Sequence, residues 1–135
     1  MAAEYRSLDP FASPAFRALQ EYVLEARESV AGGNVSFEDF EMGLLERLMA
    51  LGADLTAQHL ARYDVEAEEV MFQGEPFRFK MKWKEEYCGI GGKFPVERSI
   101  YVPRSREGKA ICPLEIRAGM GAHPVFPLYI RTYDA

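Results

Sequence analysis

The segment from Phe37 to about Tyr63 constrains the fold most, because its apolar residues recur every three or four positions. This spacing predicts one long helix of about seven turns. Gly43 and Gly52 each cost such a helix up to about 1 kcal/mol relative to alanine, so we expect close packing against a neighbour at both. The apolar stripe is wide enough to favour a helix that packs on a core, and it leaves pairing between two chains open. Its members are Phe37, Phe40, Leu44, Leu48, Leu51 and Leu55, with Leu45 and Met49 beside them.

A shorter helix is expected before the long one. Ser13 and Pro14 form a start signal for a helix from about 15 to 31, because serine caps a helix and proline fits its first position. The pair Gly32-Gly33 terminates this helix. Ser36 then supplies the cap of the long helix, which carries negative residues in its first turn near the positive end of the helix dipole.

After Val65 the apolar period changes from helical spacing to alternation, which predicts strands. We expect a short strand at 70–73, a turn at 74–76, strands at 77–84 and 96–102, and a flexible glycine-rich connection at 85–95. The two longer strands should form an antiparallel hairpin on the long helix. The predicted fold is α+β, with two N-terminal helices, the second long, packed on a small antiparallel β-sheet or hairpin. One domain covers 1–120, helical at 13–64 and β-rich at 68–117, and a divergent tail covers 121–135.

The strand at 77–84 alternates strictly between apolar and cationic residues. In a regular strand, Phe77, Phe79, Met81 and Trp83 would pack on the core, and Arg78, Lys80, Lys82 and Lys84 would project together from the other face. Such a basic ladder suits contact with phosphates. It also suits an edge strand whose lysines repel unwanted strand pairing, and both interpretations stay open.

Charge divides the chain into two unequal halves. Residues 1–72 contain 14 Asp and Glu against 5 Lys and Arg, a net charge of −9, whereas residues 73–135 contain 7 against 11, a net charge of +4. Only the second half is therefore electrostatically suited to a polyanion. No apolar run approaches the roughly 18 residues that span a bilayer, and the N-terminus lacks a secretory pattern, so we expect a cytoplasmic protein without membrane contact.

The sequence contains no recognisable catalytic or metal-binding pattern. Cys88 and Cys112 each lack the second cysteine of a C-x-x-C knuckle, and His59 and His123 do not complete a ligand set, so we expect reduced thiols and no metal. The serines and cysteines lack a histidine pattern that would activate a nucleophile. We therefore expect neither a cofactor nor an autonomous enzyme.

Several short segments follow one another at a distinctive spacing. They are Leu8-Asp9-Pro10-Phe11, Pro14-Ala15-Phe16, Leu55-Thr56-Ala57-Gln58-His59-Leu60-Ala61, Pro95-Val96-Glu97-Arg98-Ser99-Ile100-Tyr101 and Ile111-Cys112-Pro113-Leu114-Glu115. Over about residues 8–120 their order resembles the N-terminal region of bacterial insertion-sequence transposases of the ISKra type. Members of that family tend to show a proline-phenylalanine opening, a Gln-His-Leu-like helix end, a Val-Glu-Arg-x-x-Tyr strand and a Pro-Leu-Asp/Glu segment.

The resemblance implies DNA transposition by an RNase H-like nuclease domain with an acidic triad, which lies further along a full-length transposase. No catalytic carboxylate carries over to this chain, so the expectation is a truncated N-terminal domain with an accessory DNA-binding or assembly role. Arg78, Lys80, Lys82, Lys84 and Arg98 would contact DNA phosphates, and the long helix would mediate a homodimer. The alternative is a stand-alone interaction protein that dimerises through the helix and binds no nucleic acid.

Overall fold

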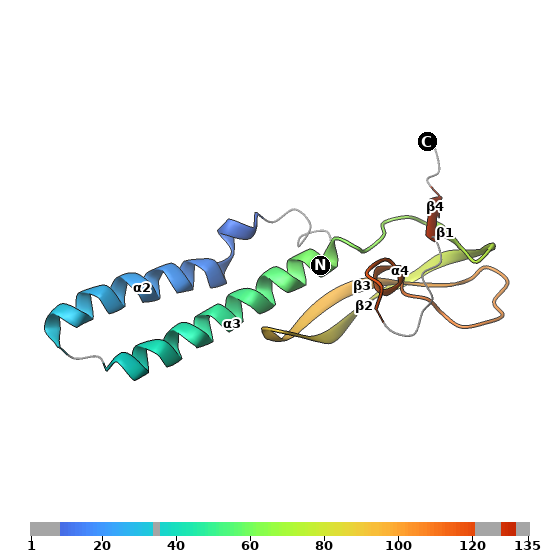
Figure 1. Cartoon of the computed structure of the whole chain (residues 1–135). Coiled ribbons are helices and arrows are strands. Elements are labelled where there is room, and N and C mark those ends of the chain that lie inside the picture. Colours follow the sequence, from blue (N-terminus) through green and yellow to red (C-terminus); the bar gives the residue numbers. More distant parts are fainter. Residues whose placement is uncertain (1–8, 34–35, 121–127, 132–135) are drawn as a thin grey trace.

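A helical hairpin and a β portion lie end to end in the computed structural model, which describes residues 9–33, 36–120 and 128–131 (Figure 1). After the short 3-10 helix η1 (Pro10–Ala12) come helices α2 (Pro14–Gly32) and α3 (Phe37–Ala61), which run antiparallel. The β portion contains β1 (Glu69–Phe72), β2 (Glu75–Gly89), β3 (Gly92–Pro103), the short helix α4 (Pro113–Arg117) and β4 (Leu128–Arg131). The predicted α+β fold, with two N-terminal helices and a long second one, is confirmed. Of the expected tail, residues 128–131 form β4, and the rest lies outside the described residues.

The helix boundaries follow the local signals of the sequence. The Ser13 hydroxyl accepts hydrogen bonds from the backbone N–H groups of Ala15 and Phe16, and the Ser36 hydroxyl accepts one from Asp39. Gly33 ends α2 in the left-handed conformation, with a φ of 70°, and its N–H donates to the Val30 carbonyl. These contacts satisfy backbone groups that have no partner within a helix, so both predicted starts and the predicted glycine stop are confirmed.

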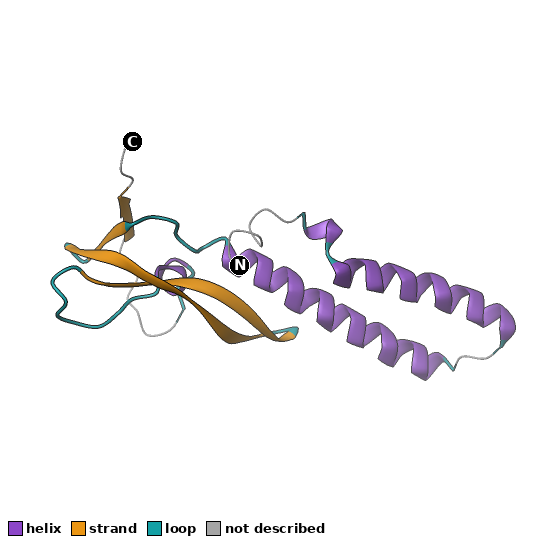
Figure 2. Ribbon diagram, turned by 180° about the vertical axis from the view of Figure 1, so that it is seen from behind, coloured by secondary structure: helices purple, strands orange, loops and turns teal. Residues whose placement is uncertain are grey.

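All strands pair antiparallel, in the order β3-β2-β1-β4. Gln73 and Gly74 both have positive φ and connect β1 to β2 in a two-residue turn, whose twist matches that of the flanking strands. The flexible connection expected at 85–95 was wrong, because β2 and β3 pair as far as Gly89 and Gly92. Most of β2 and β3 therefore forms a long two-stranded ribbon that twists back toward the helices (Figure 2).

A β-bulge interrupts the ribbon and changes which side chains share a face. The register shifts between Phe79 and Met81, so that Lys80 is the extra residue of β2. Because a strand alternates faces with a period of two, an inserted residue reverses the facing of everything that follows. The strict alternation of the sequence therefore does not place all four apolar residues of 77–84 on one face of the sheet.

Two hydrophobic clusters form the core, and they lie on opposite faces of the ribbon. The first joins the last turns of α3 to the distal half of the ribbon and to α4, and contains Ala57, Leu60, Ala61, Tyr87, Phe94, Val96, Cys112 and Leu114. The second surrounds the link after α3 and contains Val65, Val70, Phe72, Phe77, Tyr101, Ile111 and Ile116. Phe77 and Tyr87 thus enter different clusters. Phe79, Met81 and Trp83 lie between them and are exposed, so their predicted place in the core was wrong.

Among the described residues, the long helix packs on the β portion only through its C-terminal part. Ala53, Ala57, Leu60 and Ala61 contact the first cluster, whereas Phe37, Leu45 and Leu48 are exposed. The apolar stripe that predicted a core-facing helix is thus mostly outside the core. Tight packing explains Gly43, because a Cβ atom there would collide with the ring and hydroxyl of Tyr22 on α2. It does not explain Gly52, where a Cβ atom would make only an ordinary 3.8 Å contact with Gly91.

Candidate nucleic-acid interface

The four cations of the predicted ladder are on the ribbon, but the bulge divides them. Lys82 pairs with Ser99 and Lys84 with Glu97 across β3, on the face that carries Phe79 before the bulge. Arg78 lies on the opposite face, and Lys80 is the bulged residue. The expectation of four charges projecting together from one face was therefore wrong. The cations instead surround the ribbon.

These side chains remain accessible to a ligand. Arg78, Lys80 and Lys84 are exposed and Lys82 is half-buried. Among the described residues, none of the four forms a side-chain ion pair within 4 Å. Arg78 and Lys84 do have carboxylate neighbours, since Glu69 and Glu97 are their cross-strand partners. The least compensated positive charge therefore lies near Lys80 and Lys82.

Large apolar side chains lie among the cations. Phe79 is 42% exposed, Met81 36% and Trp83 53%. From Lys80 onward, β2 has only β3 as a strand neighbour among the described residues, so its other edge is also open. This part of the ribbon is therefore a solvent-exposed surface of cations and aromatic rings rather than a packed part of the core.

Arg98, the fifth predicted phosphate contact, lies opposite Trp83 on β3 and is only 8% exposed. Its Nε donates to the Tyr87 hydroxyl at 2.7 Å, and one terminal nitrogen donates to the Trp83 carbonyl at 3.3 Å. The other terminal nitrogen lies 3.5 Å from Glu85 and 3.9 Å from Glu115. Because these contacts occupy the guanidinium, Arg98 stabilises the fold and does not belong to the exposed cationic surface.

Tyr87 and Glu115 complete a polar network around Arg98. The Tyr87 hydroxyl donates to a Glu115 carboxylate oxygen at 3.0 Å while it accepts from Arg98. Burial raises the pKa of Tyr87 well above its usual value, although Arg98 opposes the shift. Burial lowers the pKa of Arg98, but the hydrogen bond with Tyr87 and the charge of Glu115 leave it above its usual value. The network therefore keeps a neutral tyrosine between a cation and an anion.

A second buried polar group holds the link between α3 and β1. Asp64 is 1% exposed and accepts from the backbone N–H and the hydroxyl of Ser99, at 2.9 and 3.0 Å. The Tyr101 hydroxyl donates to the Ala67 carbonyl, and Tyr101 forms an isolated β-bridge with Ile111. The segments 96–101 and 111–115 are thus in direct contact. The sequence does not predict these pairs, because the paired residues lie far apart along the chain.

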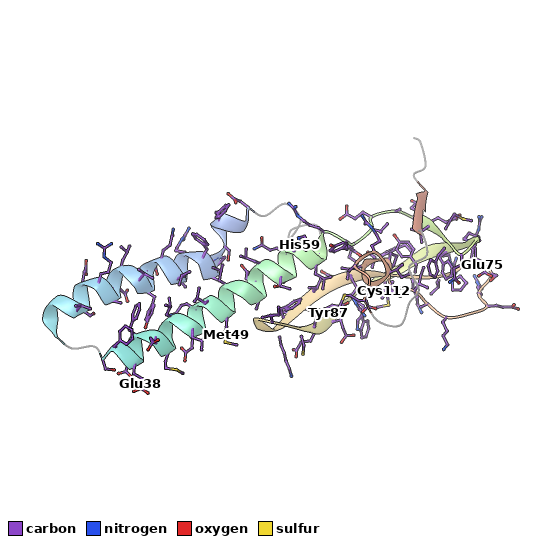
Figure 3. The ribbon with its side chains drawn as sticks, viewed as in Figure 1. Glu38, Met49, His59, Glu75, Tyr87 and Cys112 are labelled. Carbon is purple, nitrogen blue, oxygen red and sulfur yellow. The ribbon has the colours of Figure 1, made fainter. Side chains whose placement is uncertain are left out.

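The remaining candidate residues do not converge on a chemical site. Cys88 is exposed and Cys112 is buried, and burial raises the pKa of the Cys112 thiol to about 11. His59 is exposed near the end of α3, with its ring against Tyr63, and His123 lies outside the described residues. Figure 3 shows Cys112 near Tyr87, where the ribbon passes α4. Within the described ranges, no group of three or more His, Cys, Asp or Glu side chains is placed to hold a metal ion.

Comparisons with known proteins add no assignment. No family model, curated protein or solved structure matches the chain. Among the helices that the structure describes, none combines the length and apolarity needed to cross a membrane.

Proposed function

We propose that this chain is a non-catalytic DNA-contacting module, equivalent to the N-terminal part of an ISKra-type transposase, and that its β2–β3 ribbon contacts the phosphate backbone. The observation that carries the proposal is the set of cations around the ribbon, at Arg78, Lys80, Lys82 and Lys84, which have no ion pair with any described carboxylate. Contacts of this kind position a protein on DNA without reading its sequence.

The separation of charge in space supports this role. Helices α2 and α3, residues 14–61, contain eight acidic and three basic residues, whereas residues 77–84 contain four basic and no acidic ones. The helical hairpin and the ribbon lie on different parts of an elongated molecule (Figure 1). DNA would therefore be attracted to the ribbon and repelled by the helices, which orients the module.

The bulge also suits the proposal. The major groove of B-DNA admits a two-stranded β-ribbon, and phosphates line both of its edges. A ladder on one face of the ribbon would reach the phosphates of one DNA strand. The bulge places Arg78 on one face and Lys82 and Lys84 on the other, with Lys80 between them. This arrangement would reach the phosphates of both DNA strands.

The transposase-like motifs support the assignment in a different way. Arg98, Tyr101 and Glu115 belong to the two contacting motif segments, and each makes a buried or half-buried polar contact that fixes the shape of the ribbon base. Their role in the proposed module is to hold the ribbon in position, so the motif residues need no contact with DNA.

A titration with neutralised variants tests the proposal. Binding to a fluorescently labelled duplex at low salt should weaken about tenfold or more in R78Q/K80Q, since two phosphate contacts are lost. The matched control is R17Q/R62Q, which removes two exposed cations, one from α2 and one directly after α3, and should bind like the wild type. Undetectable wild-type binding, or an equal loss in both variants, would contradict the proposal and favour the stand-alone interaction protein.

A further inference from the structure

The helical hairpin lacks a core of its own. Among the described side chains, none of α2 is buried, and α3 has buried residues only from Ala57 onward. A helix with an apolar stripe is stable when that stripe packs on another element, and two helices alone provide only one line of contact. Between 14 and 56, each helix therefore lacks a neighbour on at least one side.

The contacts within the hairpin show which side of α3 is already occupied. Tyr22 of α2 stacks on Phe40 and lies under the guanidinium of Arg47, and Ser13 donates to Asp54. Phe40, Arg47 and Asp54 follow one another at intervals of seven residues, so they occupy one heptad position of α3. The other stripe residues occupy heptad positions next to that one on the helix surface. They are Phe37, Leu44, Leu48, Leu51 and Leu55. A stripe that spans this many positions is typical of a bundle helix with two neighbours, and before the ribbon-tip contact at Met49 only α2 lies beside α3 among the described elements.

Two shallow grooves mark the open face of the hairpin. One has a volume of about 310 Å³ and is lined by Val23, Ala26, Arg27, Val30, Ser36, Phe37 and Phe40. The other, of about 420 Å³, is lined by Glu38, Glu41, Met42, Leu44, Leu45 and Leu48. The linings adjoin along the first turns of α3. Val30 is 72% exposed and Phe37 75%, so the apolar residues of this face are open to solvent.

We propose that a second copy of this chain covers the face, so that two helical hairpins form a four-helix bundle related by a two-fold axis. The face has the size that such a dimer needs. The 19 residues of α2 extend over about 28 Å, and the matching length of α3 lies beside them. With half of these residues turned to the partner, each copy contributes roughly 20, as in a standard interface.

The two grooves carry opposite charges at their borders, although each hairpin is acidic overall. Arg27 borders the first groove, and Glu38 and Glu41 border the second. In a two-fold interface every contact occurs twice, so Arg27 of each copy is able to meet an acidic residue of the other. With the two-fold axis perpendicular to the helices, the bundle would place the two basic ribbons at distant ends of the dimer, away from the interface. This inference does not depend on DNA binding.

Sedimentation equilibrium over protein concentrations of about 1 to 100 μM tests the bundle. The wild type should show twice the chain mass of 15.3 kDa, and the midpoint of thermal unfolding should rise with concentration. In L48E a charge enters the apolar interface, and the dimer dissociation constant should rise about 100-fold or more. The matched control is L24E, whose side chain is also exposed but lines neither groove, and it should dimerise like the wild type.

V30E provides a second test from α2, because the 72% exposed side chain tolerates a charge in a folded monomer. Far-UV circular dichroism should show unchanged helix content, with dimerisation weakened as in L48E. A wild type that stays monomeric at 100 μM, or forms larger open assemblies, would overturn the two-fold bundle. The two-fold bundle would also be overturned if L24E weakened the dimer as much as L48E and V30E do.

Discussion

At the scale of single residues, Arg98 shows how a predicted surface contact can prove to be a buried one. Its position in the cationic half of the chain predicts a phosphate contact, and its segment resembles a Val-Glu-Arg-x-x-Tyr strand. The structure places the guanidinium between Tyr87, Glu85 and Glu115. No spacing rule predicts this, because Tyr87 lies 11 residues before Arg98 and Glu115 lies on α4.

The Arg98 network should be important for stability. Arg98→Met keeps a similar stem but removes the donors, which leaves Tyr87 and Glu115 without their buried cation. We expect a loss of about 2–3 kcal/mol in the free energy of unfolding, measured by urea denaturation. Arg78→Met is the control on the exposed part of β2, and it should change stability by no more than about 0.5 kcal/mol. If Arg98→Met and Arg78→Met were equally stable, the Arg98 network would not contribute to the stability of the fold.

At the scale of elements, the sequence predicts helices better than it predicts the contacts of strands. Ser13, Ser36 and Gly33 act through neighbours in the chain, so the starts of α2 and α3 and the end of α2 could be predicted. The bulge at Lys80 could not be predicted. Apolar and cationic residues alternate without a break from Phe77 to Lys84, and nothing local indicates an extra residue. It results from two separate clusters that bury Phe77 and Tyr87 on opposite faces.

The tip of the ribbon and α3 make a second contact that the sequence conceals. Gly91 at the tip lies against the backbone of α3, where a Cβ atom would be 2.9 Å from the Ala53 nitrogen and the Met49 carbonyl oxygen. Gly91→Ala should therefore push the tip off the helix and cost about 1–3 kcal/mol.

Gly52→Ala is the informative counterpart, because it adds the same methyl group on the other side of this contact. The methyl has room there, and alanine is the better helix former, so unfolding free energy should rise by up to about 1 kcal/mol. Thermal or urea denaturation of Gly91→Ala and Gly52→Ala measures the change in unfolding free energy of each variant, which should have opposite signs. A neutral Gly91→Ala would mean that the tip does not rest on α3.

At the scale of the whole molecule, the charge division of the sequence corresponds to a division in space. The acidic first half forms the helical hairpin, and the basic second half contains the ribbon (Figure 1). The α+β class and the order of elements could be predicted from the change in apolar period. The exposure of the apolar stripe of α3 could not be predicted, because periodicity shows that a helix has an apolar side without showing what covers it.

The salt dependence of DNA affinity tests the central proposal most directly. Each phosphate contact on B-DNA contributes about −0.9 to the slope of the logarithm of the association constant against the logarithm of the salt concentration. The wild-type affinity should fall steeply with salt, R78Q/K80Q should show a slope shallower by about 1.8, and R17Q/R62Q should keep the wild-type slope. A wild-type affinity independent of salt, or the same slope in all three proteins, would contradict a phosphate-binding ribbon.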